Sequence, residues 1–244
     1  MRFDIITLFP EMFSAIDYGV IGRAKGRKLI DLKFWNPRDY AENDYRKVDD
    51  SSYGGGPGMV MMVKPLQAAI QAAHKDNNES TTVIYLTPQG KLLKHNLVME
   101  LVTKPVLILV SGRYEGIDER LMEIESGIEV SIGDYVLSGG ELAAMVIIDA
   151  VARQLPGVIG DGGSVMQDSF SQGLLDYPHY TRPGVVDGYK VPEVLLSGDH
   201  AAVERFRRKE ALGKTWLKRP ELLTKIELTA VDRMLLNEFI GDLT

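Results

Sequence analysis

Hydrophobic residues follow two different periods along this chain. Short apolar runs bounded by turn residues are typical of strands, and longer stretches with apolar residues every three or four positions are typical of helices. In the first two thirds of the chain the two patterns alternate, which predicts an α/β fold with a largely parallel sheet. The predicted strands span residues 2–9, 29–35, 83–86 and 106–110, and the predicted helices among them span 10–17, 64–74 and 139–155.

The helix predicted at 139–155 is the clearest of these. Apolar residues run nearly all round it, as expected for a buried packing helix or for one that contacts another subunit. Pro156 and Gly157 end it, because proline cannot continue a helix and glycine commonly follows one.

The chain divides after this helix. Residues 160–164 are all glycine, aspartate or serine, a composition typical of a linker, and beyond Asp199 the predicted elements are helical. We therefore expect an α/β domain at 1–159, a flexible linker at 160–168 and a small, mainly helical domain at 169–244. The helices predicted in the second domain span 199–212, 220–226 and 229–238.

Three polar or glycine-rich segments, 87–90, 111–118 and 131–141, each follow an apolar run of the first domain. Glycines at such junctions let main-chain amides and carbonyls approach a small molecule closely, and they permit backbone angles that other residues avoid. The last segment leaves a predicted strand and opens the long apolar helix. Three strand–loop–helix junctions on one sheet predict one shared ligand pocket.

Composition narrows the functional classes. The chain has no cysteine, which excludes disulfides, thiolate metal sites and a cysteine nucleophile. Its four histidines show no metal-ligand spacing, so a structural zinc site is not expected. No apolar run approaches the roughly 20 residues that span a bilayer, and the N-terminus lacks the architecture of a secretion signal. We therefore expect a soluble, cytoplasmic protein.

The formal net charge of −6 argues against a wholly basic nucleic-acid binder, although average charge conceals local patches. One run of fifteen residues near the C-terminus contains seven basic residues and a single acid, Glu210. The ordinary interpretation of the run is a solvated helix face, and the alternative is a footprint for RNA phosphates. Its basic residues are Arg205, Arg207, Arg208, Lys209, Lys214, Lys218 and Arg219.

The common nucleotide motifs are absent. Neither a strand-linked G-x-G-x-x-G nor a G-x-x-x-x-G-K-[ST] occurs, which weakens dehydrogenase and P-loop interpretations. The glycine-rich run at 54–58 superficially resembles a phosphate cradle, but no lysine follows in the required place. It is compatible with a structural turn.

A second cluster of candidate functional residues lies at 167–183, where charged residues and aromatic residues crowd into a segment with little periodicity. Asp168 is compatible with a helix cap, His179 with an ordinary loop histidine, and Glu115 with a surface ion pair to Arg113. Arg153, near the end of the long helix, is also compatible with complementing the helix dipole. The charged residues of the segment are Asp168, Asp176, His179 and Arg182.

As an ordered set, these motifs resemble the bacterial tRNA (guanine-N1)-methyltransferases of the knotted, S-adenosylmethionine-dependent SPOUT superfamily. The chain departs from the family pattern at Ser52, where proline is usual, and at Phe206, where tryptophan is common. The resemblance implies a deep trefoil knot around the cofactor pocket, which periodicity does not predict. The matching segments are 8–13, 36–39, 53–59, 114–116, 132–141, 153–157, 168–183, 198–201 and 219–223.

The resemblance implies methyl transfer from S-adenosylmethionine to N1 of guanosine 37, next to the tRNA anticodon. N1 of neutral guanine carries a proton, so the reaction needs a base and a positive partner for charge that develops on O6. Asp168 is the candidate base and Arg153 the candidate O6 stabiliser.

Residues from the three junctions are expected to bind the methyl donor, and Glu115 is a candidate for binding either its amino group or the target guanine. The expected donor-binding residues are Tyr85, Leu86, Thr87, Pro88, Gly90, Ser111, Gly112, Arg113, Tyr114, Glu115, Gly116, Ser131, Ile132, Gly133, Tyr135, Val136, Leu137, Gly139 and Gly140. The expected tRNA-binding residues are Gly58, Ser169, Asp176, His179, Arg182, Arg207 and Arg208.

By the same resemblance, two chains form a homodimer in which the segment 168–183 closes the donor pocket of the other subunit. A Mg²⁺ dependence is implied as well, but no ligand cluster in the sequence identifies a metal site. Alternatives are a related knotted methyltransferase with another RNA target or a ribose target, a non-catalytic RNA-binding module, and a phosphate-transfer enzyme. The phosphate-transfer enzyme is disfavoured because no lysine follows the glycine-rich run at 54–58 in the required place.

Overall fold

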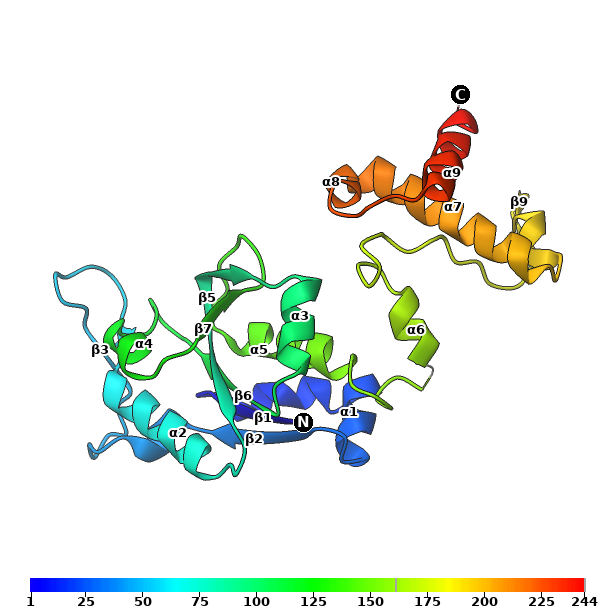
Figure 1. Ribbon diagram of the computed structural model, residues 1–244. Helices are drawn as coiled ribbons and strands as arrows, with labels where there is room; N and C mark the ends of the chain where they lie inside the picture. The colour runs from blue at the N-terminus through cyan, green and yellow to red at the C-terminus, as the bar shows by residue number, and fades with distance from the viewer. Residues whose placement is uncertain (161, 244) are drawn as a thin grey trace. The chain divides into compact units, whose positions relative to one another are not determined.

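The computed structural model describes residues 1–160 and 162–243, so residues 161 and 244 of the expected linker and second domain lie outside the described residues. The chain forms two compact units, Met1–Asp161 and Gly162–Thr244 (Figure 1). Each is described by itself below.

The first unit is built on a five-stranded parallel sheet with the order β2-β1-β6-β5-β7. This confirms the α/β fold with a parallel sheet. The chain neighbours β1 and β2 pair, and β6 inserts between β1 and β5, so segments distant in sequence become adjacent. The strands are β1 (Arg2–Ile6), β2 (Asp31–Trp35), β5 (Thr81–Leu92), β6 (Val106–Ser111) and β7 (Ile128–Ser131).

Helices cover both faces of this sheet. Successive side chains of a strand point to opposite faces. Phe3 and Ile5 therefore pack with α1, α3, α5 and η1, whereas Ile6 packs with α2 and α4 on the other face. The bounds are η1 (Pro10–Ile16), α1 (Gly19–Gly26), η2 (Pro37–Tyr40), α2 (Val63–Lys75), α3 (His95–Val102), α4 (Arg120–Ile124) and α5 (Glu141–Ala152).

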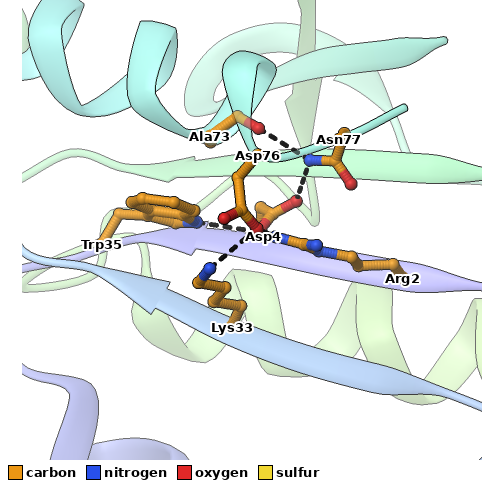
Figure 2. Close-up of polar contacts among 7 residues, drawn as sticks. All are labelled: Arg2, Asp4, Lys33, Trp35, Ala73, Asp76 and Asn77. Atoms are coloured by element: carbon orange, nitrogen blue, oxygen red, sulfur yellow. Dashed lines mark hydrogen bonds and ion pairs between the residues drawn. The ribbon is translucent and has the colours of Figure 1, made fainter. Parts of the chain in front are cut away.

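Asp4 is one of the buried polar residues of this unit, and it lies on the face covered by α2. The carboxylate of Asp4, fully buried in β1, accepts hydrogen bonds from Arg2 (2.8 Å), from Nε1 of Trp35 (2.7 Å) and from the amide of Asn77 (2.8 Å), as Figure 2 shows. A buried carboxylate is tolerated when its oxygens are satisfied in this way. Asp4 is therefore part of the sheet's internal packing.

The structure corrects the first of the three predicted junctions. Residues 87–90 do not lead from a strand into a helix; they lie inside β5, which continues to Leu92 with a register shift between Leu86 and Lys91. Any side chain at Gly90 would overlap the main chain of Val130, so glycine allows β5 and β7 to approach here. The other two segments do connect a strand to a helix.

The second unit is mainly helical in its described residues. The expected linker includes α6 (Gly162–Gln167), and the longest helix, α7 (His200–Lys218), extends six residues beyond the predicted end at 212. Asp199 caps α7 by accepting from the amides of Ala201 and Ala202, and Thr229 and Asp232 form a capping box on α9. The remaining elements are β8 (Val185–Val186), β9 (Tyr189–Lys190), η3 (Glu193–Leu196), α8 (Pro220–Leu223) and α9 (Ala230–Gly241).

The core of the second unit is small. Leu174, Ala211, Leu212 and Leu235 are its buried members, and α7 packs chiefly on α9. Across the described residues, no helix of either unit combines the length and apolarity that crossing a bilayer requires.

Candidate active site

A cavity of about 390 Å³ lies at the carboxyl ends of β5, β6 and β7, where ligands of parallel α/β sheets commonly bind. The structure brings all of the predicted donor-binding residues into its wall except Gly90 and Ser111. The three predicted segments therefore face one cavity. Six further lining residues were not named as donor-binding residues, although the first three of them belong to the predicted segments: Gln89, Ile117, Ser138, Met122, Val130 and Ala143.

These additional residues differ in how far the sequence indicated them. Ser138 lies between two predicted lining residues, so it was within reach of the same reasoning. Ala143 and Met122 belong to helices, and their apolar side chains carry no sequence pattern that separates a cavity wall from a core. Only the packing of α4 and α5 against the sheet identifies them.

Close packing requires two glycines of the segment 131–141. Gly139 and Gly140 have no left-handed backbone angles; instead, any side chain at Gly139 would overlap Nε of Arg113, and one at Gly140 would lie 2.8 Å from Cα of Ser111. The amide of Gly140 also donates to the carbonyl of Gly112 (2.9 Å). The glycines thus let the segment after β7 pack closely on the segment after β6.

Arg113 is the most connected side chain of the cavity wall. Its Nε forms an ion pair with Oε2 of Glu141 at 2.9 Å, without the alignment of a hydrogen bond, and its Nη1 donates to the carbonyl of Ser138 (3.1 Å). The guanidinium also lies 4.5 Å from the ring centre of Phe9. The acid that pairs with Arg113 is therefore Glu141, and the alternative of a surface pair with Glu115 is not observed.

Glu115 lies against Gly58 instead, so that any side chain at Gly58 would overlap its carboxylate. Gly58 adopts a φ of +82°, which favours glycine. Main-chain hydrogen bonds join the two segments: Glu115 donates to Met59 (2.9 Å), and Met61 donates to Gly116 (2.9 Å). The structure thus brings a predicted donor-binding residue next to a predicted tRNA-binding residue. The strands of this region are β3 (Asp49–Asp50) and β4 (Val60–Met61).

Tyr85, which lines the cavity, and Ser111, which does not, carry polar groups with different environments. Burial, with a smaller effect from Glu125, raises the pKa of Tyr85, whose hydroxyl donates to the main-chain carbonyl of Glu125 (2.7 Å). Tyr85 is therefore a neutral phenol at physiological pH. Ser111 is also buried, and its Oγ has no hydrogen-bond partner among the described residues. Its hydroxyl group is thus available for further hydrogen bonding.

The two predicted catalytic residues belong to different units. Arg153 directly follows α5 and is half-buried, with its amide donating to the carbonyl of Asp149 (3.1 Å). Asp168 follows α6 in the second unit, is also half-buried, and accepts from the amide of Ser171 through its main-chain carbonyl (3.2 Å). Both roles rest on the family resemblance.

The segment after Asp168 is held by polar contacts of its own. Ser169 Oγ accepts from the amide of Asp176 (2.9 Å), and a carboxylate oxygen of Asp176 lies 2.9 Å from Nε2 of His179. The His179 ring stacks at a tilt on Tyr177. Three predicted tRNA-binding residues therefore lie together, whereas Arg182 has no ion pair among the described residues and is exposed.

Most basic residues of the run at 205–219 form ion pairs within the second unit. Arg205 pairs with Glu238 (2.6 Å), Arg208 with the buried Asp232 (2.7 Å), Lys209 with Asp242 (2.7 Å), and Arg219 with Glu221 (2.5 Å). Arg207 instead lies with its guanidinium 4.8 Å from the ring centre of Tyr177 and is exposed. The predicted tRNA contacts Arg207 and Arg208 thus have different surroundings.

A second cavity, of about 610 Å³, lies between this segment and α7, with Asp168, Tyr177 and Arg207 among its lining residues. Within residues 1–160 and 162–243, no group of three or more acidic or histidine side chains is placed to hold a metal ion.

Comparisons with known proteins cover nearly the whole chain. The sequence model of the family described as "tRNA (Guanine-1)-methyltransferase TrmD" matches residues 1–225. The chain is 58% identical to the tRNA (guanine-N(1)-)-methyltransferase of Nitrosospira multiformis, over 97% of this chain and 96% of that protein. It is 57% identical to the protein of that name from Photorhabdus laumondii (98% and 96%) and 55% identical to that from Tolumonas auensis (100% and 98%).

Proposed function

The chain belongs to the tRNA (guanine-1)-methyltransferase family, and from this premise we propose that it transfers a methyl group from S-adenosylmethionine to N1 of guanosine 37 in tRNA. The observation that carries the proposal is the cavity at the carboxyl ends of β5, β6 and β7, in a chain whose full length matches curated enzymes of that name. Its volume is within the range of about 300–1,000 Å³ typical of small-molecule sites.

The cavity suits the proposed donor. Leu86, Ile132 and Leu137 offer apolar contacts for an adenine ring, while main-chain groups of the glycine-rich segments offer hydrogen bonds to its edges. When bound, S-adenosylmethionine supplies an electrophilic methyl group. The trefoil knot around the cavity belongs to this proposal, by the family resemblance.

In the proposed mechanism, Asp168 takes the proton from N1 of guanine as the methyl carbon is transferred from sulfur to N1. The S–C bond of the donor would break as the N–C bond forms, and S-adenosylhomocysteine would be the leaving group. An ordinary aspartate has a pKa of about 3.9, so proton loss must accompany methyl transfer rather than precede it. Arg153 stabilises the negative charge that develops on O6, because a guanidinium stays charged and presents directional donors. Gly58 and Glu115, which lie together, are proposed to contact the target guanine.

Homodimer formation is also part of the proposal. Helix α5 buries most of its surface, yet Leu142 and Val146, one turn apart, are 47% and 45% exposed. Two large apolar side chains on one ridge of a helix favour contact with another chain. In the proposed dimer, the segment 168–183 closes the donor pocket of the partner subunit.

The second unit is proposed to bind tRNA. Arg207 and Arg182 are exposed and form no ion pair in the described structure, so they suit phosphate contacts. Ser169, Asp176 and His179 form a polar cluster next to the candidate base. Magnesium dependence and a cytoplasmic location stay predictions from the family.

The direct test is transfer of labelled methyl from S-adenosylmethionine to a tRNA transcript with guanosine 37, beside the same transcript with adenosine 37. We expect incorporation with guanosine alone, and nucleoside digestion should identify 1-methylguanosine. Label in a ribose-methylated nucleoside would overturn N1 as the target. Tight tRNA binding without donor binding would instead favour the RNA-binding module.

A further inference from the structure

Glu141 is a fully buried carboxylate at the start of α5 that the proposed reaction does not use. Its Oε1 accepts a hydrogen bond from the hydroxyl of Thr7 (2.9 Å), and its Oε2 pairs with Nε of Arg113 (2.9 Å). The N-terminal end of α5 adds a favourable dipole. We call Thr7, Arg113 and Glu141 the clasp, because removing any one partner leaves a buried polar group unsatisfied.

The clasp joins three segments that are far apart in sequence. Thr7 directly follows β1 and is 1% exposed, Arg113 follows β6, and Glu141 begins the helix that follows β7. The Thr7 hydroxyl oxygen also accepts the amide of Phe9 (3.0 Å), whose ring lies beneath the Arg113 guanidinium. The hydroxyl of Thr7 thus constrains the side chain of Arg113 in two ways, through Glu141 and through the ring of Phe9.

Arg113 in turn holds the wall of the cavity. Its Nη1 donates to the main-chain carbonyl of Ser138, and its Nε occupies the space that a side chain at position 139 would need. The next amide, of Gly140, donates to the carbonyl of Gly112. The main chain at 138–140, which lines the cavity, is therefore attached to the segment after β6 by a side chain and by a backbone hydrogen bond.

We propose that Thr7 and Glu141 are positioning residues for the methyl donor: they orient Arg113, which holds residues 138–140 in the conformation that binds S-adenosylmethionine. The inference rests on the proposed function for the identity of the donor. Neither Thr7 nor Glu141 lines the cavity, so their effect on donor affinity passes through Arg113. A preorganised wall raises affinity because binding then costs less ordering of the loop.

The competing explanation is that the clasp only stabilises the fold. The Asp4 cluster of Figure 2 provides a matched control, because Asp4 is also a fully buried carboxylate that pairs with an arginine and accepts a further side-chain hydrogen bond. None of its residues lines the cavity. Asp4→Asn and Glu141→Gln therefore remove the same charge from two comparable sites, of which one touches the cavity wall.

The experiment measures S-adenosylmethionine binding by calorimetry on the full-length wild type, Thr7→Val, Thr7→Ser, Glu141→Gln and Asp4→Asn, with a thermal melt of each. Hydrogen exchange of the segment 131–140 is followed without donor. Thr7→Val removes the hydrogen bond to Glu141 and the one from the amide of Phe9. We expect it to raise the Kd about fivefold to tenfold and to speed exchange. Thr7→Ser should keep the Kd and the exchange rate near their wild-type values. Asp4→Asn should lower the melting temperature and leave those two quantities unchanged.

Donor affinity within twofold of wild type in Thr7→Val and Glu141→Gln would overturn the inference. An equal loss of affinity in Asp4→Asn would do the same, since it would mean general loosening of the fold. If Glu141→Gln does not fold, the near-isosteric pair Thr7→Val and Thr7→Ser decides alone. A wild type that binds no S-adenosylmethionine would overturn the proposed function itself, and the inference with it.

Kinetics give a second readout. With saturating tRNA, Thr7→Val should raise the KM for the donor while kcat at saturating donor and the KM for tRNA stay within about twofold. A purely structural defect would lower the active fraction, and so kcat, at unchanged KM. That result would contradict the positioning role.

Discussion

The two units of this protein are stabilised in different ways. The first has a buried cluster on each face of its sheet and a cavity whose wall is fixed by main-chain and side-chain contacts. In its described residues the second has a core cluster of four buried apolar residues, and its long helix is joined to α9 by ion pairs. The difference predicts that the first unit is the more stable of the two and that the second depends more on charge.

The largest effect is expected from Asp168→Asn, which changes a residue of the second unit and leaves the cavity of the first unit unchanged. We expect turnover to fall about a thousandfold, within the 10²–10⁴ range of general-base contributions, while calorimetric donor binding stays normal. Methyl transfer under single-turnover conditions with saturating tRNA measures the loss. Near-normal turnover would remove Asp168 from the role of base.

A core substitution tests the difference in packing. Leu212→Ala should cost about 2–5 kcal/mol, a large share of what a four-residue core provides, because the side chain is fully buried. The second unit should then melt in a separate, earlier transition while donor binding persists. The matched control is Leu107→Ala, fully buried in the first unit, which should lower donor binding and stability together. A single shared transition in Leu212→Ala would show that the units are not independent.

The basic run offers a comparison within one helix. Arg207→Gln should weaken tRNA binding and reduce the slope of log affinity against log salt by about one, as expected for loss of one phosphate contact. Arg205→Gln removes the same charge from a side chain that already pairs with Glu238. The tRNA affinity of this variant should therefore change less than that of Arg207→Gln. Filter binding over a salt series measures both. Equal slopes for Arg207→Gln and wild type would indicate that Arg207 makes no phosphate contact and that this part of the basic run is a solvated helix face.

Acid should affect the second unit first. The hydrogen bond from Arg208 lowers the pKa of Asp232 to about 2, from an ordinary value near 3.8. A lowered folded-state pKa stabilises the fold above the unfolded pKa, and this stabilisation is lost as the pH falls from about 5 toward 2. Because Arg208 is one-third exposed, we expect a contribution of about 1–2 kcal/mol.

Denaturant titrations at pH 7 and pH 3 measure this contribution. Asp232→Asn should remove most of the difference that the second unit shows between the two pH values. The same substitution also weakens the capping box with Thr229, so Thr229→Ala serves as the control for that loss. An unchanged pH dependence in Asp232→Asn would assign the acid sensitivity to other groups.

The fold was predictable where the pattern is local. Apolar runs identified β1, β2 and β6 to within three residues at their ends, and the capping residue Asp199 identified the start of α7. The continuation of β5 through Pro88 and Gly90 was not predictable, because proline and glycine are ordinarily turn residues. The reason they lie in a strand is the close approach of β7, a neighbour that sequence pattern does not specify.

The candidate site shows the same limit. Glycine-rich segments after apolar runs identified most of the cavity wall, since carboxyl ends of parallel strands meet at one edge. The sequence left a surface pair of Arg113 with the nearby Glu115 as one interpretation, whereas the structure pairs Arg113 with Glu141, twenty-eight positions away. A charged side chain in a loop has many acids within reach, and only packing selects among them.

By itself, the sequence determined the α/β class, the segments that form the cavity, and the family to which the chain belongs. The tertiary structure alone decided that Thr7 meets Glu141 across 134 positions, and that Gly58 lies against Glu115. Periodicity reports which face of an element is buried, but not which element covers it. In a parallel sheet whose strands pair out of sequence order, contacts of this kind arise only when the chain has folded.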